Sequence, residues 1–275
     1  MPDIALAVID AVAPPISLLT PASTPAPVST QKPTSALILA AGRGQRMRPL
    51  TDSTPKPLLT VRGQALIDWH VQALANGGVT RLVVNTDWLG QQIPDHFQHQ
   101  ITSQPNRYAG KQLLISYSHE GIDFGAALET AGGIARALPL LGDVFWVVAG
   151  DVFTPDFVFS PAAVERFAAS GKLAHLWLVP NPAHNPAGDF GLSEDGLALN
   201  LTAPSAQPRY TFSTIALYRA AFFAALPFGN PQGVKAALAP LLRRWMDHHQ
   251  VSAELYPGAW TDVGTPARLA ELNRT

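Results

Sequence analysis

A glycine-containing loop near the start of the chain has the residue types that bind a polyphosphate. It follows a short apolar run at residues 37–39, and Gly42 and Gly44 let the backbone turn tightly and approach a ligand. Positive charge is concentrated on and just after this loop, at Arg43, Arg46, Arg48 and Lys56. Guanidinium groups and exposed backbone N–H groups are the donors that phosphate oxygens accept from. The pattern therefore predicts a polyphosphate site rather than a site for a single carboxylate.

Asp151 is the second residue whose position suggests chemistry. It directly follows the most apolar run of the chain, residues 144–149, and Gly150. An aspartate at the tip of a central strand, across from the glycine loop, is placed to hold Mg²⁺ on the phosphates. A Gly-Asp pair after a buried strand is also typical of a turn in which the side chain caps the backbone. Together with the glycine loop, the pattern favours metal binding.

The elements that must position these residues alternate between strand and helix in the first half of the chain. Apolar residues recur at helical spacing over residues 66–74, and Gly77-Gly78 provides a stop signal. We expect His70 to pack on the apolar face of this helix. The other elements expected here are strands at residues 36–40, 81–85, 113–117 and 144–149 and a helix at residues 89–98. This order predicts an α/β fold with a doubly wound, mostly parallel Rossmann-like sheet, in which ligands bind at the carboxyl ends of the strands.

The second half of the chain has a different character. A strand is expected at residues 173–179, followed by a loop at 180–190 that is rich in Pro, Asn and His. Shorter strand-like pieces follow at 191–192, 198–202 and 210–218, with helices at 240–247 and 266–272. We interpret this part as a smaller, mixed β region. The expected organisation is one domain at residues 35–275, with one half at 35–155 and the other at 156–275.

Two common phosphate-binding motifs do not fit the loop. The dinucleotide fingerprint needs a third glycine where this chain has Met47, and no stretch matches the P-loop. The pattern that remains is L-A-A-G-x-G-x-R-M-x-P-L-T followed by P-K-P-L, from Leu39 to Leu58. With it the chain resembles the sugar-1-phosphate nucleotidyltransferases, and the resemblance extends over about residues 36–272. It implies a nucleotide-diphospho-sugar transferase fold and transfer of a nucleotidyl group to a sugar 1-phosphate. It also implies that the half at 35–155 binds the nucleotide and the half at 156–275 binds the sugar.

The resemblance also implies roles for individual residues. The loop that wraps the nucleoside triphosphate would comprise Leu39, Ala40, Ala41, Gly42 and Gly44. Arg46 and Lys56 would be catalytic, because they would stabilise the charge that grows on the leaving pyrophosphate. The residues near the nucleobase would be Glu120, Glu129, Thr130 and Gly132. Glycines at a helix start can instead serve only close packing on the sheet, and the pattern leaves that alternative open.

The metal and sugar sites come from the resemblance as well. The segment Trp260-Thr-Asp-Val-Gly-Thr-Pro266 is similar to the family's W-x-D-x-G-T-P, whose aspartate completes the metal site, so Asp262 would join Asp151 in holding Mg²⁺. A cap for the last helix is supplied by Thr265 and does not account for Asp262. The residues expected to face the sugar are Asp189, Gly191, Ser213 and Thr214.

One departure from the family pattern narrows the choice of substrate. Many members carry a glutamate–lysine pair that holds the sugar phosphate, yet this chain has no lysine between Lys172 and Lys235. Its loop at residues 181–192 is instead similar to that of N-acetylmuramate 1-phosphate uridylyltransferases of bacterial cell-wall recycling. The substrates implied are UTP and N-acetylmuramate 1-phosphate. Mannose 1-phosphate with GTP, glucose 1-phosphate with dTTP, and a non-catalytic nucleotide-sugar sensor remain as alternatives. His184 would meet the lactyl or phosphate group, or lie in the loop without a ligand role.

Composition excludes several other classes. Of 275 residues 47% are apolar, which is enough for one large α/β domain or two small ones. The net charge of −1 gives no basic surplus for nucleic acid. The chain has no cysteine, which fits a reducing compartment, so we expect a cytoplasmic protein. No apolar stretch is long enough for a membrane span. Residues 1–34 are rich in Pro, Ala, Ser and Thr, and we expect a disordered extension without a targeting role.

Overall fold

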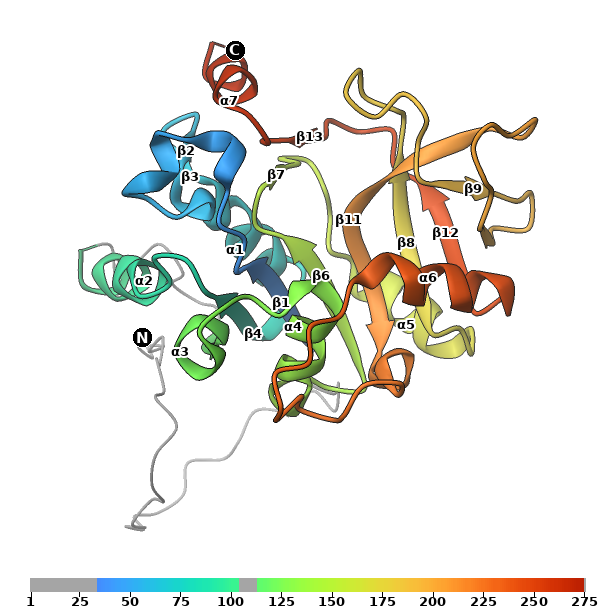
Figure 1. The fold of residues 1–275 in the computed structure, drawn as a ribbon, viewed down its shortest axis with the longest axis horizontal. Helices are drawn as coiled ribbons and strands as arrows, with labels where there is room; N and C mark the ends of the chain where they lie inside the picture. The colour runs from blue at the N-terminus through green and yellow to red at the C-terminus, as the bar shows by residue number, and fades with distance from the viewer. Residues whose placement is uncertain (1–33, 104–112, 275) are drawn as a thin grey trace, which may run out of the picture.

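A computed structural model describes residues 34–103 and 113–274 (Figure 1). The extension expected at residues 1–34 lies outside the described residues, apart from Thr34, which begins the first strand. No helix in the described part of the chain is long and apolar enough to cross a membrane.

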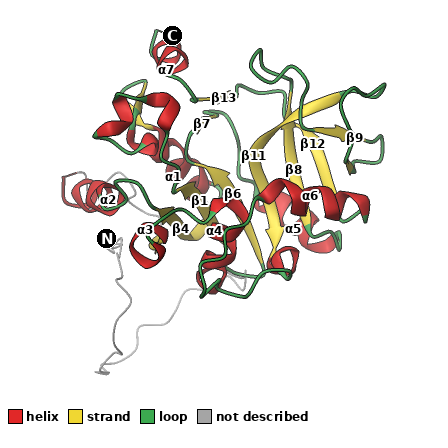
Figure 2. Ribbon diagram, in the orientation of Figure 1, coloured by secondary structure: helices red, strands yellow, loops and turns green. Residues whose placement is uncertain are grey.

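A mixed sheet of nine strands runs through the described protein (Figure 2). Its strands are β1 (Thr34–Ala40), β4 (Val79–Thr86), β5 (Leu114–His119), β6 (Val144–Ala149), β8 (Ala174–Val179), β9 (Phe190–Leu192), β10 (Ala198–Leu199), β11 (Arg209–Arg219) and β12 (Val251–Leu255). The order is β10-β9-β11-β6-β1-β4-β5, and β8 pairs with both β11 and β12. Strands β5, β4, β1 and β6 are parallel, whereas β11 runs antiparallel to β6 and β8. The predicted α/β fold with a mostly parallel sheet is confirmed.

Helices cover both faces of the sheet. One face carries α1 (Leu66–Asn76), α2 (Gln92–Ser103) and α5 (Pro161–Ala169), and the other carries α4 (Glu129–Ala137) and α6 (Leu238–Asp247). Alternate side chains of each strand enter the two cores, so Ile38 belongs to the first core and Leu37 to the second. Because both faces of the sheet are covered, residues 36–40 of β1 and all residues of β6 are apolar.

The carboxyl-terminal part of the described chain returns to the region beside the glycine loop. The short strand β7 (Val152–Phe153) pairs antiparallel with β13 (Thr261–Asp262), and the helix α7 (Pro266–Leu272) follows β13. A third core joins this tail to the hairpin of β2 (Thr60–Val61) and β3 (Gln64–Ala65). Its buried members are Met47, Leu59, Val61, Leu66, Phe153, Val263 and Leu269. Residues near the end of the chain therefore pack on the half that was expected to bind the nucleotide.

The expected elements are found, with shifts of a few residues at their ends. The helix expected at 89–98 begins at Gln92, because Leu89 has a left-handed φ of 51° that a helix cannot include. The short helix α3 (Glu120–Phe124), the helix α5 and the two-residue strands β2, β3, β7 and β13 were not expected. His70 is buried in the first helix as expected, and its Nε2 lies 2.9 Å from the carbonyl oxygen of Val152.

Candidate active site

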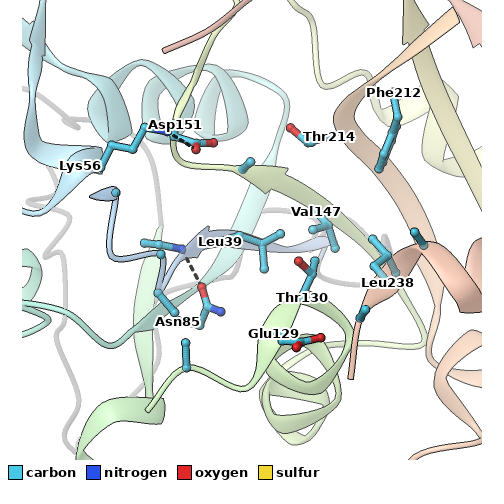
Figure 3. A pocket seen from close by; sticks show the side chains of 18 of the residues that line it. Leu39, Lys56, Asn85, Glu129, Thr130, Val147, Asp151, Phe212, Thr214 and Leu238 are labelled. Atoms are coloured by element: carbon cyan, nitrogen blue, oxygen red, sulfur yellow. Dashed lines mark hydrogen bonds and ion pairs between the residues drawn. The ribbon is translucent and has the colours of Figure 1, made fainter. Parts of the chain in front are cut away.

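A pocket with a volume of about 980 Å³ lies at the carboxyl ends of β1, β4 and β6 (Figure 3). Its walls come from the glycine loop, the start of α4, the loop before β9, the middle of β11 and the start of α6. This is the edge of a parallel sheet at which ligands are expected to bind. Of the predicted site residues, the pocket is lined by Leu39, Ala40, Ala41, Gly42, Gly44, Arg46, Lys56, Glu120, Glu129, Thr130, Asp151, Asp189 and Thr214.

The glycine loop owes its shape to one left-handed residue. Gly44 has φ 65°, and a Cβ at this position would come 3.0 Å from Cγ2 of Thr51 and 3.3 Å from Cβ of Lys56. The hydroxyl of Thr51 donates to the carbonyl oxygen of Gly44 at 2.9 Å and fixes the turn. Gly42, in contrast, has open space around it, so its backbone is accessible to a ligand. The side chain of Arg46 is exposed at the same edge of the pocket.

Lys56 and Asp151 form an ion pair inside the pocket (Figure 3). The Nζ of Lys56 lies 2.6 Å from Oδ2 of Asp151, and the two residues are 95 positions apart in the chain. Lys56 is only 7% exposed, whereas the side chain of Asp151 is 36% exposed and reaches the pocket. The turn that carries Asp151 is tied to β1, because Gly150 N–H donates to the carbonyl oxygen of Leu39 at 2.8 Å. The predicted phosphate-binding lysine and the predicted metal ligand are therefore in direct contact.

A network of buried hydrogen bonds through Asn85 and Glu120 supports the floor of the pocket. Oδ1 of Asn85 accepts from the backbone N–H of Ala40 at 2.7 Å, and Nδ2 of Asn85 donates to Glu120 at 2.6 Å. The other carboxylate oxygen of Glu120 accepts from the N–H of Leu128 at 2.7 Å. Burial raises the pKa of Glu120, although these two hydrogen bonds oppose the shift. Because both its oxygens are engaged, Glu120 lines the pocket mainly as a support for the loop before α4.

At the start of α4, Glu129 and Thr130 line the pocket, whereas Gly132 packs against another segment of the chain. Glu129 has a left-handed φ of 59°, and both Glu129 and Thr130 line the pocket (Figure 3). Gly132 does not line it, since a Cβ there would meet the carbonyl oxygen of Val234 at 2.5 Å. Its N–H donates to the carbonyl oxygen of Ala236 at 3.1 Å. The placement of Gly132 fits the close-packing alternative for this position.

The opposite end of the pocket is built by β11 and the loop before β9. Oδ2 of Asp189 accepts from the N–H of Phe212 at 2.8 Å, which holds the carboxylate against the strand. Pairing of β11 with β8 is interrupted between Phe212 and Ala216, and within this bulge Thr214 has φ 63° and faces the pocket. Ser213 is turned away and donates to the carbonyl oxygen of Trp177 at 2.6 Å. Of the predicted sugar residues, Asp189 and Thr214 therefore reach the pocket.

Gly191 and Ser213 lie outside the pocket for separate reasons. Gly191 pairs with Leu199 in the sheet, and a Cβ there would meet Cδ1 of Leu201 at 2.4 Å. Ser213 is fully buried in the core behind β11. Both residues thus help to shape the wall behind Asp189 and Thr214 without facing into the pocket.

Asp262 lies beside the Asp151 turn but is engaged by other side chains. Val263 N–H donates to the carbonyl oxygen of Asp151 at 2.9 Å, so the two segments are adjacent. The Asp262 carboxylate accepts from Nη1 of Arg268 at 2.9 Å and lies 3.5 Å from Nε2 of His184. Asp262 is not among the residues that line the pocket, although its neighbour Gly264 is. His184 therefore contacts the predicted metal ligand rather than the sugar end of the pocket.

Comparison with known proteins matches this arrangement. A family model described as nucleotidyl transferase covers residues 35–275. The chain belongs to the nucleotidyl transferase family. It is 45% identical over 244 residues to an N-acetylmuramate alpha-1-phosphate uridylyltransferase from Neisseria meningitidis, which covers 86% of this chain and 95% of that protein. A protein of the same name from Caulobacter vibrioides is 31% identical over 261 residues, which covers 88% and 99% of the two chains. The prediction of a sugar-1-phosphate nucleotidyltransferase is confirmed.

The fold of this nucleotidyl transferase also recurs among solved structures. A Bacillus anthracis protein assigned as a glucose-1-phosphate thymidylyltransferase, crystallised with sucrose, superposes with a TM-score of 0.70. The match covers 88% of this chain and 94% of that chain at 20% identity. At this identity the similarity establishes the fold alone.

Several residues of this nucleotidyl transferase pocket were not expected from the sequence. Asn85, Phe190, Phe212, Leu238 and Arg243 line it, and they come from four different elements or their ends. Arg43 was noted for its charge, and its guanidinium carbon lies 3.7 Å from the centroid of the Trp88 ring. Asn85 lies near the carboxyl end of the apolar strand β4, and Asp151 lies just beyond the carboxyl end of β6, so that position was an available signal.

Proposed function

We propose that this nucleotidyl transferase converts UTP and N-acetylmuramate 1-phosphate to UDP-N-acetylmuramate and pyrophosphate. The observation that carries the proposal is that Lys56 and Asp151 line the same pocket as Asp189 and Thr214. The first pair suits a triphosphate, and the second offers a carboxylate and a hydroxyl to a sugar. The names of the two uridylyltransferase relatives, which match nearly their whole length, support the choice of substrates.

The chemistry requires charge neutralisation more than a nucleophilic side chain. The second pKa of a phosphate monoester is about 6, so the sugar phosphate is largely dianionic at neutral pH and needs no general base. One of its oxygens attacks the α-phosphorus of UTP, the new P–O bond forms, and the bond to the β-phosphate breaks to release pyrophosphate. Lys56 and Arg46, which line the pocket, would stabilise the negative charge on the pyrophosphate oxygens. Holding two anions in line is the main task of the pocket.

Mg²⁺ fits the site by the chemistry of its donors. Proteins commonly hold Mg²⁺ with one or two carboxylates, and substrate phosphates and waters complete the coordination. Asp151 and Asp262 offer two carboxylates from adjacent segments, and among residues 34–103 and 113–274 no cluster of three or more ligating side chains offers an all-protein site. The ion when bound would neutralise phosphate charge. Each carboxylate already contacts a cation of the chain: Asp151 contacts Lys56, and Asp262 contacts Arg268. These two ion pairs balance the charge of the carboxylates before substrates bind.

The experiment that tests this function is a pyrophosphate-release assay with every pairing of UTP, dTTP, GTP, CTP and ATP with four sugar 1-phosphates. The sugars are N-acetylmuramate, N-acetylglucosamine, glucose and mannose. We expect turnover to be highest with UTP and N-acetylmuramate 1-phosphate and to stop when EDTA removes the metal. Preference for GTP with mannose 1-phosphate or dTTP with glucose 1-phosphate would replace the proposed substrates. Absence of pyrophosphate with every pair would indicate a non-catalytic protein.

A further inference from the structure

Arg243 is a cation at the sugar end of the pocket. It lies on α6, which covers the opposite face of the sheet from α1 (Figure 1). Arg243 lines the pocket together with Phe190 and Leu242, and its guanidinium carbon is 5.2 Å from the centroid of the Phe190 ring. The ion pair of Lys56 and Asp151 occupies the other end, on the side of the glycine loop (Figure 3).

The hydrogen bonds of Arg243 orient its guanidinium without neutralising it. Nη1 donates to Oδ1 of Asn200 at 2.7 Å. The amide nitrogen of Asn200 in turn donates to both carboxylate oxygens of Asp247, at 2.9 and 3.2 Å. Asn200 therefore stands between the arginine and the aspartate, and Arg243 contacts a neutral amide instead of a carboxylate.

Four other arginines of the described chain differ from Arg243 because each is paired with an aspartate. Among the described residues, ion pairs with aspartate are made by Arg48, Arg136, Arg219 and Arg268, and none is made by Arg243. A guanidinium carries five N–H donors in a planar fork, and one of them is engaged by Asn200. The remaining donors suit a carboxylate or phosphate oxygen of a ligand.

The position of Arg243 decides between those two anions. The phosphate of a sugar 1-phosphate must meet the α-phosphate of the nucleotide, and the cations for that encounter are Lys56 and Arg46 at the loop end. A sugar bound by Asp189 and Thr214 would lie in the same pocket as the Arg243 side chain of α6. An anion carried on the sugar ring itself, away from the phosphate, is the group that Arg243 can reach.

N-Acetylmuramate has such a group. It differs from N-acetylglucosamine by a lactyl group in ether linkage to the oxygen on C3. The lactyl carboxylate, like other carboxylic acids with a pKa of about 4, is ionised at neutral pH. The lactyl methyl group would meet an apolar wall, because Phe190, Leu238 and Leu242 line the pocket around Arg243. The carboxylate of Asp189 lines the pocket as well, and both its oxygens accept hydrogen bonds, from Phe212 and Asn185.

We propose that Arg243 binds the lactyl carboxylate of N-acetylmuramate 1-phosphate and thereby selects this acidic sugar over neutral ones. The proposal rests on the function proposed above. Asn200 and Asp247 act as positioning residues, since they orient the guanidinium without contacting the sugar.

The test compares Arg243→Gln with the wild type in the UTP-dependent assay. The substrates are N-acetylmuramate 1-phosphate and N-acetylglucosamine 1-phosphate, and the latter is used as a substrate or as a competitive inhibitor. A lost charge-assisted hydrogen bond should lower kcat/KM for the acidic sugar about 10- to 100-fold, mainly through KM. The kcat/KM or inhibition constant of N-acetylglucosamine 1-phosphate should change by less than about 3-fold, because this sugar has no carboxylate that Arg243 could bind. Arg243→Lys should keep part of the preference, because it keeps the charge.

Arg244→Gln is the matched control, because it removes the same charge from the next residue of α6. Its guanidinium stacks near the Trp245 ring, and Arg244 does not line the pocket, so both sugars should be used as by the wild type. An equal loss with both sugars in Arg243→Gln, or no loss with either, would overturn the role of Arg243 and leave the proposed function standing. A wild type that turns over only neutral sugar phosphates would overturn both.

Discussion

Lys56 is the residue on which the proposed chemistry depends most. Its ammonium lies 2.6 Å from Asp151, and it is nearly buried at the loop end of the pocket. Lys56→Met keeps most of the aliphatic stem and removes the charge. We expect kcat/KM to fall about 100- to 1,000-fold, by analogy with the loss of one donor to a developing oxyanion.

The fold of Lys56→Met should persist, because Asp151 is 36% exposed and can be hydrated once its partner is lost. Thermal unfolding measured beside activity checks this. Lys172→Met is the control, since Lys172 is exposed and donates to the carbonyl oxygen of His249, outside the pocket. Near-normal turnover by Lys56→Met would remove Lys56 from the mechanism.

Thr214 carries backbone strain at the pocket wall. Its φ of 63° is in the left-handed region, which costs a residue with a Cβ roughly 1–2 kcal/mol. Glycine avoids this cost and alanine does not, so Thr214→Gly should be more stable than Thr214→Ala by about 1 kcal/mol. Urea unfolding of the two variants measures the difference. Equal stabilities, or a less stable glycine variant, would show that this position is not strained.

The pocket residues differ in how far the sequence could predict them. Lys56 and Asp151 were each predicted from a local motif, but their contact spans 95 positions and only the folded sheet reveals it. Ser213 and Thr214 are adjacent, and the choice of which one faces the pocket depends on the bulge in β11. Arg243 belongs to no motif, because its role depends on where α6 packs. The roles assigned to these residues remain predictions.

At the scale of elements, α1 is linked to the Asp151 turn by His70. Because a carbonyl oxygen can only accept, Nε2 of His70 must carry the hydrogen that meets the Val152 oxygen at 2.9 Å. Burial lowers the pKa of His70 from 6.5 to about 4, so the folded protein holds this ring neutral. In the unfolded chain the ring takes up a proton below pH 6.5. The contribution of the neutral His70 ring to the free energy of unfolding is therefore complete above pH 6.5 and is lost as the pH falls toward 4.

Chemical denaturation at pH 7 and at pH 5 tests this link. Between these values the wild type should lose about 2 kcal/mol more stability than His70→Gln, which has an amide donor but no titrating ring. The raised pKa of Glu120 acts in the opposite direction, because its contribution is present at low pH and is lost as the pH rises through the folded pKa. That contribution is common to both proteins and cancels in the comparison. If the wild type and His70→Gln lose the same amount of stability between pH 7 and pH 5, the buried, neutral state of His70 would be contradicted.

Periodicity predicted the long elements, and short ones depended on tertiary contacts. The apolar strands and α1 were predicted because their patterns are strong over many residues. The strands β7 and β13 have two residues each, and they form only because the end of the chain returns to the Asp151 turn. The helix α5 did have a signal, with Ser160 and Pro161 at its start and Ala163 and Phe167 on its buried side.

At the scale of the whole molecule, the two expected halves share one sheet. Strand β11, from the expected sugar half, pairs directly with β6 of the nucleotide half. The chain then crosses back, so that β13 and α7 pack beside the glycine loop. Such crossings leave no local mark in the sequence, which is why the boundary expected near residue 155 could be placed only by composition. The continuous sheet explains how residues from both halves come to line one pocket.

The most direct test of the account is the identity of the product formed by this chain from UTP and N-acetylmuramate 1-phosphate in the presence of Mg²⁺. Mass spectrometry of the reaction should show UDP-N-acetylmuramate, with one pyrophosphate released for each molecule formed. The product should be absent when EDTA is added and nearly absent with Lys56→Met. If wild-type protein leaves both substrates unchanged under these conditions, while the same assay detects product from another nucleotide and sugar, the proposed reaction is contradicted.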